Sequence, residues 1–117
     1  MDYHLIFNER FQDYLNDLKR VFPSMSEMVV YETMFHAMAT LDKTMPLKLF
    51  YDKVGKDYDK MIMEKNEQFF LTTDFSKIED GHLIQFLKDK WQTLNDTNKN
   101  AIWDHLRLLM TIAKKAI

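Results

Sequence analysis

The histidines are the first residues of this chain whose type could do chemistry. The chain has four of them: His4, His36, His82 and His105. No two are separated by four residues and no HExxH motif occurs, so the spacing of a helical zinc site is absent. His105 is the most interesting, because it borders apolar positions near Leu108 and Ile112. We expect a half-buried histidine there that is hydrogen-bonded to backbone, and solvent-facing histidines elsewhere.

Clustered carboxylates are the second possible source of chemistry. The stretches "DYDK" and "DFSKIEDG" each bring acidic side chains together. A calcium-binding EF-hand loop needs oxygen ligands at alternating positions, a glycine at about the sixth and a glutamate at about the twelfth. Neither stretch has that order. We therefore expect solvated charges, with no metal and no cofactor.

Nucleophilic and phosphate-binding motifs are also missing. The chain has no cysteine, so it offers no thiol nucleophile or thiolate ligand, and its two glycines cannot build a phosphate-binding loop. No nucleophile elbow occurs either. We predict a protein without enzymatic activity.

The composition indicates one helical domain. Two Gly and two Pro in 117 residues are far below the usual ~7% and ~5%, which favours long helices over turn-rich sheets. We predict an all-α fold and a single domain spanning residues 1–117. The opening residues do not resemble a signal peptide and no run approaches a membrane span, so we expect a soluble intracellular protein.

The charge gives little support for nucleic-acid binding. The formal net charge is −2 and the sequence pI is about 6.1, whereas nucleic-acid binders usually carry a basic stripe. An accessory role on nucleic acid remains the alternative function. It would require folding to gather four cations: Lys19, Arg20, Lys114 and Lys115.

Apolar spacing predicts about five helices. The expected ranges are 3–22, a second helix that follows a cap at Ser24 and ends at about 41, then 46–62, 82–94 and 96–116, with a short helical turn at 66–71. Ser24 and Glu27 have the spacing of a capping box before the second helix. Its predicted inner face is Val30 or Tyr31, Met34, Met38 and Leu41. The third helix is expected to run through Gly55 as one helix with a weak point there.

The stretch "NDTNKNAIWDHLRLLMTIAKKA" predicts the centre of the bundle. Asn95 or Asp96 can cap the helix, and apolar residues then cover most of its circumference, which is typical of a buried helix. We predict a compact bundle of about five helices around this buried C-terminal helix, with Trp91 and Trp103 both buried. The alternative is that part of its surface contacts another protein.

The methionines and aromatics indicate a partner surface. Met61-Ile62-Met63 cannot all face one core, and methionine-rich surfaces bind partners adaptably. Phe69 and Phe70 lie in an aromatic segment that must pack on the body of the protein. We predict a protein interface, for a partner or a second copy, formed by Met61, Ile62, Met63, Phe69 and Phe70.

Two stretches carry a resemblance: "EKNEQFFLTTDF" and "LNDTNKNAIWDHLRLLMTIAKKA". This last half of the chain resembles small helical proteins encoded by nucleocytoplasmic large DNA viruses. The resemblance rests mostly on apolar spacing and implies a viral origin, but no activity and no catalytic residues. The leading hypothesis is a non-enzymatic interaction module, such as a viral scaffold, virion or host-factor-binding protein, in the host cytoplasm or the virion.

Overall fold

The computed structural model describes residues 1–75 and 82–117, and the described chain is an all-α bundle, as the sequence predicts. The elements are α1 (Tyr3–Val21), α2 (Glu27–Leu41), α3 (Met45–Phe50), the π-helix η1 (Tyr51–Gly55), α4 (Lys56–Met63), α5 (Glu67–Thr72), α6 (His82–Lys90), the 3₁₀ helix η2 (Trp91–Thr93) and α7 (Asp96–Ala116). The predicted short turn at 66–71 is α5.

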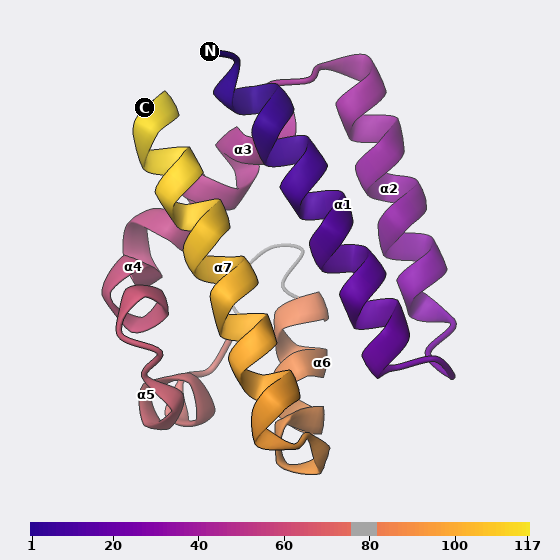
Figure 1. Ribbon diagram of the computed structural model, residues 1–117, viewed down its shortest axis with the longest axis vertical. Coiled ribbons are helices and arrows are strands. Elements are labelled where there is room, and N and C mark those ends of the chain that lie inside the picture. The colour runs from indigo at the N-terminus through magenta and orange to yellow at the C-terminus, as the bar shows by residue number, and fades with distance from the viewer. Residues whose placement is uncertain (76–81) are drawn as a thin grey trace.

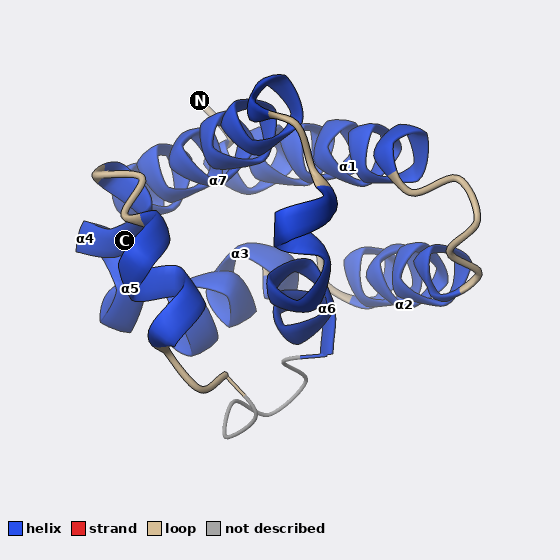
Figure 2. Cartoon of the chain, turned by 90° about the horizontal axis from the view of Figure 1, so that it is seen from below, coloured by secondary structure: helices blue, strands red, loops and turns tan. Residues whose placement is uncertain are grey.

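The helices form two layers. Helices α1 and α7 pack antiparallel along their length in one layer, and α2 runs antiparallel to α1 (Figure 1). Seen from below, α2, α3 and α6 lie in a second layer beneath α1 and α7 (Figure 2). Helix α7 also packs on η1 and α4, so it contacts more of the bundle than α2, which packs on α1 and α3.

Side-chain caps fix the starts of three helices. The side chain of Asp2 accepts from the Leu5 amide, that of Asn66 from the Phe69 amide and that of Asn95 from the Asn98 amide. Each bond satisfies one of the unpaired amides at a helix start.

The predicted capping box before α2 is wrong. Helix α2 begins after Ser26, whose backbone is helical and whose side chain makes no capping hydrogen bond. The chain enters α2 through a turn in which the Val29 amide donates to the Ser26 carbonyl at 3.2 Å. Ser24 therefore lies two residues outside the position that the capping box requires.

The expected helix 46–62 is helical but irregular. Gly55 has helical angles (φ −60°, ψ −50°), so it is not a left-handed cap. The irregularity extends on both sides of Gly55: this residue ends the π-helix η1, and α4 is kinked at Tyr58 (φ −120°, ψ 16°). A Cβ at Gly55 would lie 3.0 Å from Cε of Met110. Glycine therefore allows α7 to approach this helix closely.

The core centres on α7 and the aromatic residues packed against it. Trp91 and Trp103 are 1% and 4% exposed, which confirms their predicted burial. Phe70 lies with its ring centroid 5.1 Å from Trp91 and 5.8 Å from Trp103, both in edge-to-face geometry. Six residues of α7 are buried: Ile102, Trp103, Leu109, Met110, Ile112 and Ala113. Leu108 on the same helix is 44% exposed, so not every apolar residue of α7 is buried.

Candidate binding surface

The interface predicted around Met61 does not form an open surface. Met61 is 7% exposed, Ile62 1% and Phe70 6%, so all three belong to the core. The prediction assumed that only one side of this helix would be covered by the rest of the protein. Helix α4 instead packs against α7 and α5, and this covers more than one of its sides. Met63 is half-buried, and only Phe69, at 45% exposed, faces solvent.

The four cations of the nucleic-acid alternative are not gathered. Lys19 and Arg20 lie near the C-terminal end of α1, whereas Lys114 and Lys115 lie near that of α7, at the opposite end of the antiparallel pair (Figure 1). Three of the four are also in ion pairs. Lys19 pairs with Glu32, Arg20 with Asp17 and Lys114 with Asp59.

The predicted inner face of α2 is only partly directed inward: Tyr31 and Met38 are half-buried and line the cavity described below, but the most buried side of the helix is another one. Its buried residues are Met28 and Phe35. Val30 and Met34 on the predicted inner face are 55% and 52% exposed, and Leu41 is 84% exposed. The helix is apolar around much of its circumference, so periodicity alone could not say which side faces the core.

The exposed side of α2 has the spacing of a coiled-coil seam. Four exposed residues follow one another at intervals of four, three and four, and we call them the outer stripe: Val30, Met34, Ala37 and Leu41. This is the heptad spacing that packs knobs into holes against a second helix. Four flanking positions carry no charge: Tyr31, Thr33, Met38 and Thr40. One charge, that of the exposed Glu27, lies at the N-terminal end of the stripe, three residues before Val30.

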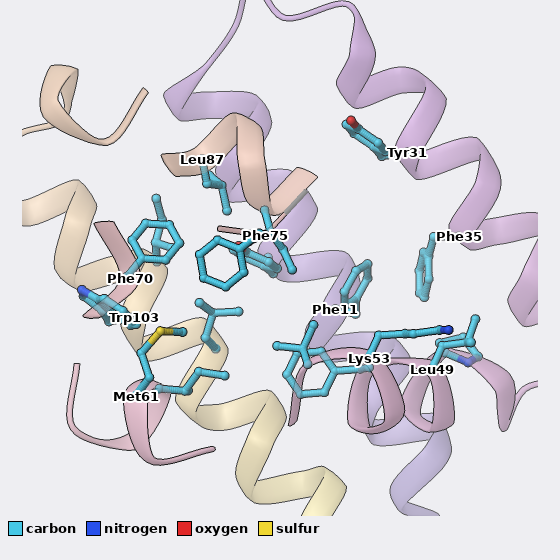
Figure 3. A pocket seen from close by; sticks show the side chains of 18 of the residues that line it. Phe11, Tyr31, Phe35, Leu49, Lys53, Met61, Phe70, Phe75, Leu87 and Trp103 are labelled. Atoms are coloured by element: carbon cyan, nitrogen blue, oxygen red, sulfur yellow. The ribbon is translucent and has the colours of Figure 1, made fainter. Parts of the chain in front are cut away.

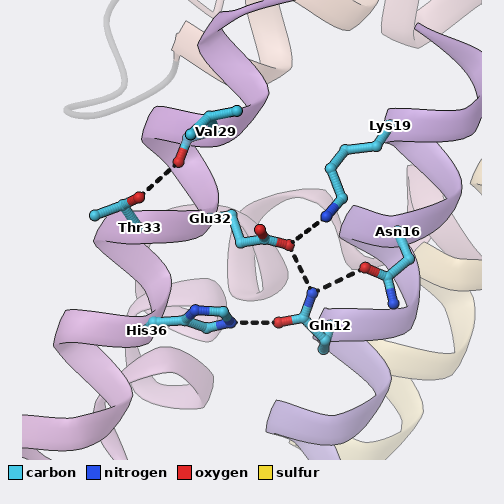
Figure 4. A network of polar contacts seen from close by, with 7 residues as sticks. All are labelled: Gln12, Asn16, Lys19, Val29, Glu32, Thr33 and His36. Carbon is cyan, nitrogen blue, oxygen red and sulfur yellow. Dashed lines mark hydrogen bonds and ion pairs between the residues drawn. The ribbon is translucent and has the colours of Figure 1, made fainter. Parts of the chain in front are cut away.

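Polar contacts hold the other side of α2 to α1 (Figure 4). Gln12 and Lys19 of α1 each donate to the same carboxylate oxygen of Glu32, both at 2.8 Å, and the Gln12 carbonyl contacts Nε2 of His36. Asn16 accepts from the Gln12 amide. We call these five residues the polar clasp. The clasp holds this side of α2 to α1, and the outer stripe lies on another side of the helix.

The clasp shifts the titration of its carboxylate. The hydrogen bond from Lys19, followed by that from Gln12, holds the pKa of Glu32 below its usual range. Both donors favour the ionised form. The clasp is therefore strongest where Glu32 is charged.

An apolar cavity of about 280 Å³ lies beside α2 (Figure 3). Its described wall is almost entirely apolar and comes from helices in both layers. It includes Phe11, Phe35, Met61, Phe70, Trp91 and Trp103. Met34 and Met38 also line it, so the cavity wall continues onto α2 beside the outer stripe. Met34 is half exposed, which places an opening of the cavity at this helix.

Lys53 is the single charged side chain among the described residues that line the cavity. In the view of Figure 3 its side chain lies at the end of the cavity away from Trp103. Both tryptophans of the chain, Trp91 and Trp103, line the cavity. The end near Trp103 is therefore aromatic, and the other end carries the Lys53 side chain. Sequence spacing could not have revealed this site, because its residues come from six separate segments.

His105 lies in a shallow polar site between α1 and α7. Its Nε2 is 3.2 Å from Oδ2 of Asp17, whose other oxygen pairs with Arg20 at 2.7 Å. The partner is thus a side chain, not the expected backbone group. The described site offers no nucleophile to this pair, being lined by Asp13, Asn16, Asp17, Arg20 and His105. The contact therefore positions α1 against α7.

The described residues offer no further site of a familiar kind. Within 1–75 and 82–117, no group of three or more histidine or acidic side chains is arranged to hold a metal ion. Across the same ranges, no helix has the length and apolar character to cross a membrane. The predicted surface histidine His82 is described only in its backbone.

Comparison with known proteins gives one partial similarity. The chain is 38% identical over 63 residues to the DNA repair protein rad13 of Schizosaccharomyces pombe. The match covers 50% of this chain but only 6% of rad13, so the chain spans a small fraction of that protein's length. No family model matches the chain, and no solved structure matches it either.

Proposed function

We propose that the protein is a non-enzymatic interaction module that pairs with a second copy through the outer stripe of α2. The observation that carries the proposal is an apolar seam left exposed while the opposite side of the same helix is held to α1. Val30, Met34 and Leu41 are all more than half exposed. Exposed, contiguous apolar surface on a folded protein commonly marks a binding site.

The spacing and the flanks favour a second copy as the occupant. A stripe spaced four, three and four residues apart accepts another helix with the same spacing. In a two-fold dimer the stripe meets itself, so no other surface is required. The charge nearest the stripe is Glu27, at its N-terminal end. An antiparallel pairing of the two stripes puts the two Glu27 carboxylates at opposite ends and therefore brings no like charges together.

The size of the stripe predicts a weak dimer. Helix α2 has 15 residues, so it is only about 22 Å long at the usual rise per residue. An interface of two heptads falls at the small end of specific interfaces, below about 1,200 Å² in total. We therefore expect a reversible monomer–dimer equilibrium that depends on protein concentration.

Adjacent valines supply the matched test. Val30 lies on the outer stripe and Val29 does not, yet both are exposed on α2, at 55% and 63%. Sedimentation equilibrium should show dimers of the wild-type protein at high micromolar concentration. Val30→Glu should weaken them by at least tenfold in Kd, whereas Val29→Glu should leave them unchanged. A wild-type protein that remains monomeric, or a loss that is equal in both variants, overturns the proposal.

We also propose that the protein is encoded by a virus and acts as a scaffold or virion component. A small self-associating helical module suits a scaffold or virion component, which is the role that the resemblance of the C-terminal half suggests. Mass spectrometry of purified virions from the source system tests it directly. Presence of the chain in amounts comparable to known structural proteins would support the assignment, and absence from virions would contradict it.

The similarity to rad13 favours an accessory role on nucleic acid as the second candidate. The distribution of Lys19, Arg20, Lys114 and Lys115 weakens it, because a phosphate backbone is bound by cations gathered on one surface. Fluorescence anisotropy with labelled duplex and single-stranded DNA at increasing salt tests this candidate. Binding that weakens steeply with salt would favour it over self-association.

A further inference from the structure

We infer that two copies of the chain pair antiparallel, in the register that places Val30 of one copy opposite Leu41 of the other and Met34 opposite Ala37. The inference rests on the proposed self-association and specifies its geometry. Helix α2 lies at an edge of the bundle, beside α1 and away from α7, in Figure 1 and again in Figure 2. Two such edges can meet while the two bundles extend away from the contact.

The spacing of the outer stripe selects the register. Its four residues are exposed and follow one another at intervals of four, three and four. These intervals are the same when read backwards, so an antiparallel copy brings Val30 level with Leu41 and Met34 level with Ala37. A shift by one heptad in either direction leaves two residues of each stripe without a partner. The aligned register therefore removes the most apolar surface from water.

The sizes of the stripe residues favour the antiparallel pair over the parallel one. In a parallel pair each residue faces its own counterpart, so a layer of two Met34 side chains lies one turn from a layer of two Ala37 side chains. The methionines hold the helices apart and leave a gap at the alanines. In the antiparallel pair each methionine faces an alanine and each valine faces a leucine. Large and small side chains then complement each other in every layer.

The charges at the ends of α2 favour the same arrangement. Glu27 is exposed at the N-terminal end of the stripe, so a parallel pair brings two Glu27 carboxylates together. Like charges that face each other across an interface oppose its formation. In the antiparallel pair Glu27 lies level with the turn that follows α2 of the second copy. This turn carries one carboxylate and one ammonium, Asp42 and Lys43, and so adds no net charge.

The lack of native cysteines makes the arrangement directly measurable. Val30→Cys and Leu41→Cys proteins are prepared separately, mixed in equal amounts and oxidised gently at high micromolar concentration. A disulfide forms readily only where the two Cβ atoms approach to about 4 Å. Intact-mass spectrometry separates the mixed disulfide from the two homodisulfides. We expect the mixed product to be at least tenfold more abundant than either homodisulfide, well above the ratio that random collision gives.

Val29→Cys is the matched control. Val29 is 63% exposed on the same helix but lies off the stripe. It should form little disulfide, either with itself or with Leu41→Cys. Substitutions at exposed positions rarely disturb folding, so all three cysteine variants should be folded.

A charge pair measures the same register without a covalent bond. When Val30→Glu protein is mixed with Leu41→Lys protein, the new carboxylate faces the new ammonium only in an antiparallel pair. In a parallel pair the two charges are about three helical turns apart. The mixed dimer should form at least tenfold more tightly than either homodimer in sedimentation equilibrium with one labelled protein. Added salt should reduce this preference.

The outcomes separate the dimer from its geometry. A wild-type protein that stays monomeric contradicts the proposed function, and the inference with it. If the wild type dimerises and Val30→Cys forms chiefly homodisulfides, the copies pair in parallel and only the inference is overturned. A random mixture of disulfides, or a mixed dimer of the charge variants that is no tighter than the homodimers, also overturns it.

Discussion

Helices α2 and α7 differ in how their content of apolar residues relates to their burial. Helix α7 carries six charged residues among its 21, yet it buries six side chains against its neighbours. Helix α2 has only two charged residues, Glu27 and Glu32, and buries two side chains. The more apolar helix is thus the less buried one. Burial depends on how many elements surround a helix, and an apolar helix at the edge of the bundle keeps surface for another molecule.

The largest effect expected from this difference is at Trp103 of α7. The residue is 4% exposed and packs edge-to-face on Trp91, with ring centroids 5.5 Å apart. Trp103→Ala should lower the free energy of unfolding by ~3–5 kcal/mol, because it leaves a large cavity in the core. Urea denaturation followed by circular dichroism measures this. A midpoint equal to that of the wild type would mean that α7 is not the centre of the core.

A matched pair of leucines compares the two helices directly. Leu109 of α7 is 1% exposed and Leu41 of α2 is 84% exposed. Leu109→Ala should cost ~2–5 kcal/mol, the range for buried leucines. Leu41→Ala should stay within ~0.5 kcal/mol, as is usual for exposed positions. The measurement is made at low micromolar concentration, where we expect the monomer. Equal costs would show that the outer stripe is covered within the monomer.

Gly55 tests how closely α7 approaches its neighbour. Helical angles at this position make alanine conformationally acceptable, and helix propensity alone would favour the substitution by ~1 kcal/mol. The new Cβ, however, would lie 3.0 Å from Cε and 3.1 Å from Sδ of Met110, which is fully buried. Overpacking typically costs ~1–3 kcal/mol. We therefore expect Gly55→Ala to destabilise by ~1 kcal/mol in thermal denaturation.

The opposite result at Gly55 would also be informative. Stabilisation by ~0.5–1 kcal/mol, the effect of a simple helical glycine replacement, would mean that the Met110 side chain moves aside without loss. Gly55→Ala combined with Met110→Leu separates the two effects. If the close contact is the cause, the cost of the alanine should differ between the wild-type and Met110→Leu backgrounds by at least ~0.5 kcal/mol.

The positions of the helices along the chain were predictable because they depend mainly on residues that are close in sequence. Apolar spacing and the Asn95 cap are local features, and the predicted ranges agree with the described helices to within a few residues. The weak point expected at Gly55 extends from the π-helix to Tyr58, since close packing against α7 and not the glycine alone shapes this segment. Local sequence carries no information about such contacts.

The exposed apolar side of α2 was not predictable, for the same reason. Which side of α2 faces inward depends on the clasp between Gln12 and Glu32, residues that are 20 positions apart. The burial of Met61 and Ile62 depends on α5 and α7 closing over α4 from separate sides. The cavity is formed by side chains from many elements, so no spacing in the sequence corresponds to it. The sequence did indicate an exposed apolar surface, but three of the residues it named for that surface, Met61, Ile62 and Phe70, are buried.

The smallest expected effect concerns the clasp that orients α2, and it depends on pH. Because the pKa of Glu32 is lowered in the folded protein, its contribution to stability is complete above the ordinary glutamate pKa of about 4.3. The contribution is lost as the pH falls through the lowered native value. Glu32→Gln should therefore cost roughly 0.2–1 kcal/mol near neutral pH, the range for exposed ion pairs. The difference from wild type should shrink to nothing in acid.

Methyl NMR of Met28 measures the opening of α2, because this side chain is 1% exposed and anchors the helix to the core. The wild-type Met28 signal should broaden or shift as the pH falls below about 4, and the Glu32→Gln protein should show the same change already at neutral pH. Glu27→Gln is the control, since Glu27 lies on the same helix outside the clasp. A difference between wild type and Glu32→Gln that stays constant across the titration would show that the Glu32 charge does not hold α2. The direction of the outer stripe would then have to come from the packing of Met28 and Phe35 alone.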